Sequence, residues 1–225
     1  FMRWYFPRLL AKTFALARQD EYEADRIAGK LLGREVTAAA LAEIEIRGAW
    51  LQAEFWGRHW CVAAGNPLPV GPYRSMRRYL AEAPDATFAN DALLQALKRL
   101  SSVDDTHPGL RDRIEALDAT PTLPAWSRGS ALALLGGGAR QWVKYFDKQW
   151  CSNNATEWKQ HHAWLERVRA RAEVLGTSMP QNSAAELVEL ARLKRHLDPH
   201  ADVRALYEHA LERSPDYPPA LCGLV

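Results

Sequence analysis

Residues 17–28 decide how the first part of this chain folds, and they read in order Ala17-Arg18-Gln19-Asp20-Glu21-Tyr22-Glu23-Ala24-Asp25-Arg26-Ile27-Ala28. Placed on a helical wheel at about 100° per residue, the surrounding segment 8–32 separates into two faces. The solvated face carries Lys12, Gln19, Glu23, Arg26 and Lys30, and the opposite apolar face carries Leu10, Phe14, Ala17, Ala28 and Leu32. The pattern therefore predicts an amphipathic helix over 8–32.

Two carboxylates, Glu21 and Asp25, fall on the apolar face of this helix, and Arg18 lies at its edge. Their spacing of four makes them neighbours one turn apart. Because a buried carboxylate without a partner costs several kcal/mol, each must be paired, protonated or bound to a metal. Helix geometry alone favours a structural ion pair from Arg18 to Glu21 or Asp25. The second interpretation makes Glu21 a metal ligand and Asp25 the group that orients a ligand histidine.

Helical spacing continues through the rest of the chain, and strand signals are nearly absent, so the predicted fold class is all-α. Further helices are predicted over 37–58, 73–82, 87–101, 108–117, 139–150, 157–175, 184–197 and 201–213. Thr37 is the predicted N-cap of the first of these, because its hydroxyl can accept a bond from a free backbone N–H. Helix breakers at 120–124 and 136–138 place a domain boundary between 120 and 140. We therefore expect a domain over 1–120, a linker over 121–140 and a helical extension over 141–225.

The extension ends in a helix-pair pattern. Its large, small, aromatic and proline positions fit the frame of the tetratricopeptide repeat, whereas Lys194 and Val203 depart from it. The matching positions are Leu187, Leu190, Ala191, Tyr207, Ala210 and Pro215. Because only one copy of the frame is visible, we expect a repeat-like hairpin that packs on a neighbouring element and offers a surface to a protein partner.

Composition excludes several classes of protein. The 225 residues carry a net charge of +2, so charge gives no support to a nucleic-acid partner. The chain has no uninterrupted apolar run of the roughly 20 residues that a membrane span needs. Cys61, Cys151 and Cys222 are far apart in sequence, which argues against a disulfide framework and against a zinc ribbon.

The segment 17–28 resembles the third-ligand helix of the membrane-associated zinc peptidases that include the CAAX prenyl protease and the bacterial heat-shock protease HtpX. That family has an Arg, two residues, a Glu, an aromatic residue, one residue, an Ala and an Asp, and Arg18, Glu21, Tyr22, Ala24 and Asp25 match these positions. A second match lies at 105–114, where the family has Thr-His-Pro followed by an Arg six residues after the His. The matching residues are Thr106, His107, Pro108 and Arg113.

The resemblance implies a role for each matched residue. Glu21 becomes the third ligand of a zinc ion, and Asp25 supports a histidine ligand of the same ion. His107 contacts the substrate carbonyl or the oxyanion that develops from it, a known source of rate enhancement. Arg113 helps to fix the His107 segment. Taken alone, His107 and Pro108 would indicate only the start of a helix, since proline suits the first helical turn.

The family's other two zinc ligands and its general base lie in an HExxH motif on an earlier helix. None of the seven histidines in this sequence begins such a motif. We therefore expect the motif to lie upstream of Phe1, and we expect this chain alone not to hydrolyse peptides. The resemblance implies a fragment of a zinc-dependent metalloendopeptidase that cleaves protein or peptide substrates, from a parent associated with the bacterial inner membrane. The alternative is a non-catalytic helical protein-interaction module.

Overall fold

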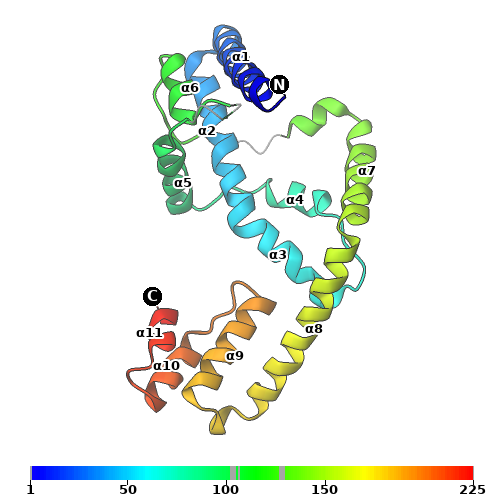
Figure 1. Cartoon of the computed structure of the whole chain (residues 1–225), viewed down its shortest axis with the longest axis vertical. Coiled ribbons are helices and arrows are strands. Elements are labelled where there is room, and N and C mark those ends of the chain that lie inside the picture. Colours follow the sequence, from blue (N-terminus) through cyan, green and yellow to red (C-terminus); the bar gives the residue numbers. More distant parts are fainter. Residues whose placement is uncertain (1, 102–104, 106, 127–129, 225) are drawn as a thin grey trace. The chain divides into compact units, whose positions relative to one another are not determined.

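The computed structural model describes residues 2–101, 105, 107–126 and 130–224, and for residues 2–12 it describes the backbone alone. Throughout the described residues the regular structure is helical and contains no strand, which confirms the all-α prediction (Figure 1). The α-helices are α1 (Met2–Leu32), α2 (Arg34–Trp50), α3 (Trp56–Cys61), α4 (Tyr73–Tyr79), α5 (Ala86–Lys98), α6 (Leu110–Ala116), α7 (Gly138–Asn153), α8 (Ala155–Thr177), α9 (Ala184–Leu197), α10 (Arg204–Arg213) and α11 (Pro218–Leu224). A π-helical turn covers Leu51–Phe55, and short 3-10 helices cover Val62–Gly65, Ala131–Leu135 and Met179–Gln181.

The chain divides into two compact units, each made of two separate stretches of sequence. The first unit contains Phe1–Ala53 and Leu80–Ser130, and the second contains Glu54–Tyr79 and Ala131–Val225. The helix predicted over 37–58 is two α-helices joined by the π-helical turn, and the passage from the first unit to the second falls inside that turn. The predicted domains are uninterrupted segments bounded at 120 and 140, whereas each unit here contains two stretches of sequence. The predicted limits stay a prediction.

The core of the first unit lies between α2, α5 and α6. Its buried side chains are Ala38, Leu41, Ala42, Ile46, Ala89, Leu93, Leu110, Ile114 and Leu117. On α2 the buried positions recur at intervals of three and four, which places them on one face of the helix. Several of them are alanines, and such small side chains let neighbouring helices approach closely.

The turn between α1 and α2 corrects the predicted cap at Thr37. The helix α2 begins at Arg34, and its N-cap is Gly33, which has a positive φ of 98°. A glycine adopts this left-handed conformation without the steric cost that a side chain would add. The Thr37 hydroxyl lies one turn inside the helix and donates to the Gly33 carbonyl at 3.0 Å.

In the second unit, α9 and α10 form the helix pair that the C-terminal pattern predicts. The frame residues Leu187, Leu190, Ala191, Tyr207 and Ala210 are all buried in one core with α8 and α11. Ser183 and Glu186 form a capping box at the start of α9, which satisfies free N–H groups of its first turn. The helix pair is thus present, and its relation to the tetratricopeptide repeat stays a prediction.

A second cluster in this unit is built from aromatic side chains. Trp158 is fully buried and donates from its indole Nε1 to the Asn66 carbonyl at 2.8 Å. Buried His59 lies against Trp150 and Trp158, with ring centroids 5.1 and 5.6 Å away. By contrast, the rings of Trp142, Tyr145 and Phe146 on α7 are exposed.

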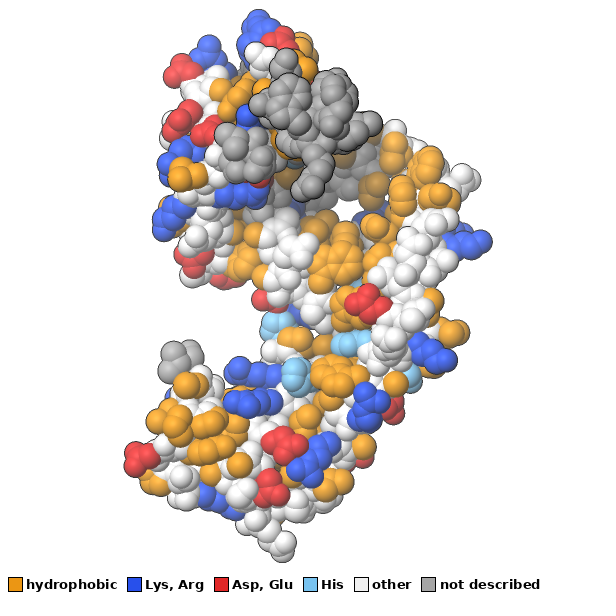
Figure 2. Space-filling model, in the orientation of Figure 1, with side chains coloured by type: hydrophobic (Ala, Val, Ile, Leu, Met, Phe, Trp, Pro, Cys, Tyr) orange, Lys and Arg blue, Asp and Glu red, His pale blue; other side chains and the backbone are white. Residues whose placement is uncertain are grey.

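Two further features of the described residues are the distribution of surface charge and the length and polarity of the helices. In the view of Figure 2, basic and acidic side chains are interspersed, in keeping with the small net charge of +2. Within the described ranges, every helix is too short or too polar to cross a lipid bilayer.

Candidate functional site

One face of α1 carries Glu21, Asp25 and Gly29 at successive intervals of four residues, and this face meets α6. The contact is close at Gly29, where a Cβ atom would lie 3.1 Å from Cδ2 of Leu117, the C-cap residue of α6. The absence of a side chain at Gly29 therefore lets α1 pack against α6. Arg113 lies one helical turn before Leu117 on α6, and this spacing brings it level with Asp25.

Asp25 and Arg113 form a two-pronged ion pair. The Arg113 Nε and one terminal nitrogen each donate to a different oxygen of Asp25, both at 2.7 Å. The side chains are 7% and 20% exposed, so the pair is largely withdrawn from water. The hydrogen bond to Asp25 raises the pKa of Arg113, burial opposes this rise, and the charges of Asp25 and Glu21 add to it. Arg113 is thus a partner of the buried carboxylate that helix geometry alone did not identify.

Glu21 links this pair to His107. One Glu21 oxygen lies 3.0 Å from the same terminal nitrogen of Arg113, and the other lies 2.9 Å from Nδ1 of His107. The Glu21 side chain is 27% exposed and the His107 side chain 70% exposed, so the series of contacts runs from the interior to the surface. The structure therefore brings together Glu21, Asp25, His107 and Arg113, although 86 residues separate Glu21 from His107.

In the sequence, Tyr22 stands only as the aromatic position of the motif at 17–28. Partial burial raises the pKa of the Tyr22 phenol, and the negative charge of Asp112 acts in the same direction, while Arg18 and Arg113 oppose it. Tyr22 therefore belongs to the electrostatic surroundings of the site and stays protonated at neutral pH. Its position directly after Glu21 was the only signal that sequence offered.

The donor atoms present determine what this site can bind. A carboxylate such as Glu21 suits Zn²⁺, which takes oxygen, nitrogen and sulfur ligands. Within the ranges that the structure describes, no group of three or more His, Cys, Asp or Glu side chains is arranged to hold a metal ion. The described residues thus fit one ligand position and its supporting contacts, and a complete zinc site needs further ligands.

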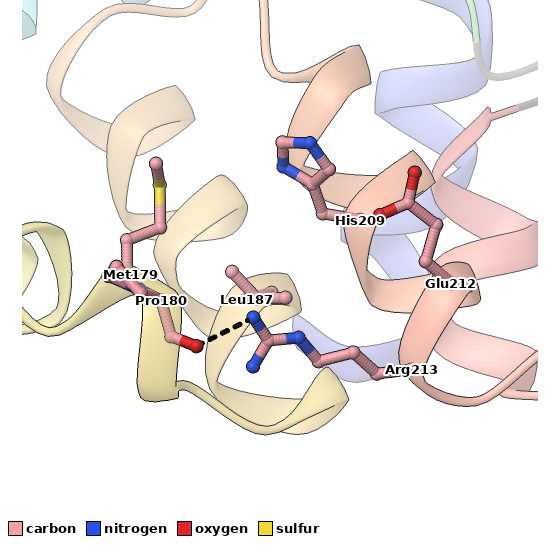
Figure 3. Close-up of a pocket in the computed structure, with 6 residues that line it drawn as sticks. All are labelled: Met179, Pro180, Leu187, His209, Glu212 and Arg213. Carbon is pink, nitrogen blue, oxygen red and sulfur yellow. Dashed lines mark hydrogen bonds between the residues drawn. The ribbon is translucent and has the colours of Figure 1, made fainter.

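A separate pocket lies in the second unit, at the helix pair. It has a volume of about 240 Å³ and is lined by Met179, Pro180, Leu187, His209, Glu212 and Arg213. Figure 3 shows Arg213 extending from α10 toward the Pro180 carbonyl, to which it donates at 3.0 Å. Because a second Arg213 nitrogen donates to the Asn182 carbonyl, this guanidinium closes the turn before α9.

Comparison with known proteins gives one match, and it covers the site around Glu21 and His107 rather than the pocket at the helix pair. The family model described as Peptidase family M48 matches residues 6–121, which is more than half of the chain and includes both 17–28 and 105–114. Searches of curated proteins and of solved structures give no match. Family M48 consists of zinc metallopeptidases, whose substrates are peptides or proteins. The chain therefore belongs to peptidase family M48 and has a metallopeptidase-type function.

Proposed function

We propose that this chain carries the third-ligand part of the active site of a zinc metalloendopeptidase, with Glu21 as the ligand. The observation that carries the proposal is the continuous series of contacts from Asp25 through Arg113 and Glu21 to His107. Glu21 and His107 lie in two separate segments, 17–28 and 105–114, of the range that the family model matches, and they meet at 2.9 Å.

Glu21 is held in a way that suits a ligand. Arg113 and His107 contact different oxygens of its carboxylate, so the group has a defined orientation. Each carboxylate oxygen has two lone-pair sites, so these contacts leave acceptor capacity for a metal ion. The 27% exposure of the side chain leaves the carboxylate open to further ligands.

Asp25 supports Glu21 through Arg113. Both oxygens of Asp25 accept from Arg113, and a second contact of the same guanidinium reaches Glu21. The pair therefore fixes the position of the guanidinium that orients the ligand, as outer partners of metal ligands commonly do. A lone pair that remains on Asp25 could also orient a histidine ligand, the role implied by the family resemblance.

His107 faces two ways. Its Nδ1 donates to the Glu21 carboxylate, and its ring is exposed to solvent. In the imidazolium form, in which both ring nitrogens carry a proton, Nε2 would donate a hydrogen bond to a substrate carbonyl or a developing oxyanion. A bound zinc ion would supply Lewis-acid polarisation and a water of lowered pKa. The remaining two ligands and the general base belong to an HExxH motif that this sequence lacks, so we propose that the chain alone is inactive.

The α9–α10 pair favours a second candidate function, a helical protein-interaction module. The pocket on this hairpin is lined by both apolar side chains, such as Leu187, and polar ones, such as His209 and Arg213. In this alternative, the contacts around Glu21 and Asp25 serve only as an ion network that holds α1 to α6.

Zinc content distinguishes the two functions. In the longest native form of the protein, we expect Glu21→Gln to lose bound zinc, because it removes one of the three protein ligands, while helical circular dichroism is retained. The matched control is Glu23→Gln, since Glu23 is exposed and pairs with Arg26 on the same helix. Equal zinc occupancy in wild type and Glu21→Gln would contradict the ligand assignment. A folded wild type that binds no zinc would favour the interaction module.

A further inference from the structure

The start of α6, just after His107, lacks the side-chain cap that such a position usually has. Its N-cap is Gly109, which has no side chain to accept a hydrogen bond from the free N–H groups of the first turn. Serine, threonine, aspartate and asparagine are the residues that normally cap a helix in this way. Some other group must therefore organise this helix end.

That group is the hydroxyl of Ser101. The Gly109 N–H donates to Ser101 Oγ at 2.7 Å, and the same hydroxyl donates to the carboxylate of Asp112. Asp112 is the third residue of α6, the position whose acidic side chain bonds directly to the N-cap N–H in an ordinary capping box. Here the Ser101 hydroxyl stands between the N–H and the carboxylate and serves both.

Glycine at 109 favours this arrangement, because it avoids tight contacts. A Cβ atom at this position would lie 3.2 Å from Ser101 Oγ and 3.2 Å from the Arg99 carbonyl oxygen. Both distances are tighter than ordinary van der Waals contact, so a side chain here would require Ser101 or the Arg99 carbonyl to shift by a few tenths of an ångström. The missing cap and the close approach of Ser101 therefore have one cause.

The contact joins the two ends of the segment that carries His107. Ser101 lies shortly after α5, and Gly109 is eight residues later at the start of α6. Pro108, directly after His107, and Leu110, the first residue of α6, are both buried. The backbone next to His107 is thus fixed by the packing of Pro108 and Leu110 and by the hydrogen bond from Gly109 to Ser101.

We propose that Ser101 is a positioning residue, which holds the His107 segment so that the imidazole stays against Glu21. This inference rests on the proposed function, because it assigns Ser101 to the reaction through His107. Ser101 itself touches Gly109 and Asp112 and is not a catalytic residue.

The test reads the imidazole directly, through long-range ¹H–¹⁵N NMR spectra of the 225-residue chain. The His107 signals are identified by their loss in His107→Gln. We expect Ser101→Ala to shift them toward their position in Glu21→Gln, and Ser101→Thr, which keeps a hydroxyl, to leave them near the wild-type position. The matched control is Ser183→Ala, which breaks an ordinary capping box on α9.

Three results would overturn the proposal: unchanged His107 signals in Ser101→Ala, an equal shift in Ser183→Ala, or unchanged His107 signals in Glu21→Gln. If Ser101→Ala loses its helical circular dichroism, Asp112→Ala removes only the far acceptor and is expected to shift the same signals. Unchanged signals in that variant would also reject the proposal. The zinc content of Glu21→Gln is measured separately, so failure of the proposed function is distinguishable from failure of this inference.

Discussion

Arg113 donates two hydrogen bonds of 2.7 Å to Asp25, a residue 88 positions earlier in the chain. One turn further along both helices, Gly29 meets Leu117. The two contacts place α1 and α6 side by side in one register. Glu21 lies one turn before Asp25 on α1 and meets His107, which precedes α6, so the candidate site depends on how these helices pack.

Removal of Arg113 is expected to be costly, because it leaves Asp25 charged in a place that excludes water. We expect Arg113→Met to lower the free energy of unfolding by about 3 kcal/mol, and Asp25→Leu combined with Arg113→Met to recover much of this loss. The control is Arg34→Met, which breaks the pair with Asp118 at 61% and 90% exposure. The loss there should stay below about 1 kcal/mol. Urea denaturation measures all three, and equal losses in the two single variants would show that the Asp25 pair is not special.

A larger side chain at Gly29 should force α1 away from α6. We expect Gly29→Leu to destabilise the protein by about 1–3 kcal/mol, the usual cost of overpacking. The same change at Gly48 on α2 meets open space, because no atom lies within 4 Å of a Cβ there, and it should not destabilise the helix. Thermal unfolding compares the two, and equal stability of both variants would contradict close packing at Gly29.

Trp158 is expected to dominate the stability of the aromatic cluster. Trp158→Ala should lower the free energy of unfolding by about 3–5 kcal/mol, since it empties a fully buried site. Trp158→Phe should cost less, because it keeps the ring but loses the bond to the Asn66 carbonyl. The exposed Trp142 is the control, and Trp142→Ala should cost little. A loss at Trp142 as large as at Trp158 would place the core elsewhere.

His59 is expected to make stability depend on pH. Burial lowers the pKa of His59 below its ordinary value of 6.5, although a backbone bond with Val70 and the charge of Asp147 oppose this. Among the described residues, its Nε2 has no hydrogen-bond partner. Because the unfolded state then binds a proton first, stability should be full above pH 6.5 and fall as the pH drops below it.

Replacement of the imidazole tests this directly. Denaturant midpoints of wild type and His59→Phe are measured between pH 5 and pH 8. As the pH falls, wild type should lose more stability than the variant, because only wild type carries the His59 contribution. The other histidines serve as an internal reference, because they are present in both proteins. Parallel curves for the two proteins would rule out His59 as the source of the dependence.

Sequence alone determined which residues share a helix face. The spacing of Glu21 and Asp25 within 17–28 placed both on the apolar side of α1, and the structure confirms a buried Asp25 and a half-buried Glu21. The helical content and the α9–α10 pair were predictable for the same reason. The α-helix has 3.6 residues per turn, so the pattern of one helix face can be recognised in a short stretch of sequence.

Tertiary structure decided the partners. Arg18 was the nearest cation by helix spacing, yet the two-pronged partner of Asp25 is Arg113, which no local pattern ties to α1. No local pattern tied Ser101 to Gly109. Nor did any local pattern assign residues 54–79 to the second unit rather than the first. Contacts between distant residues follow from which faces bury together, and a glycine such as Gly29 sets how closely those faces approach. Spacing along one helix carries no information about that choice, because packing is settled by the shape and chemistry of both surfaces at once.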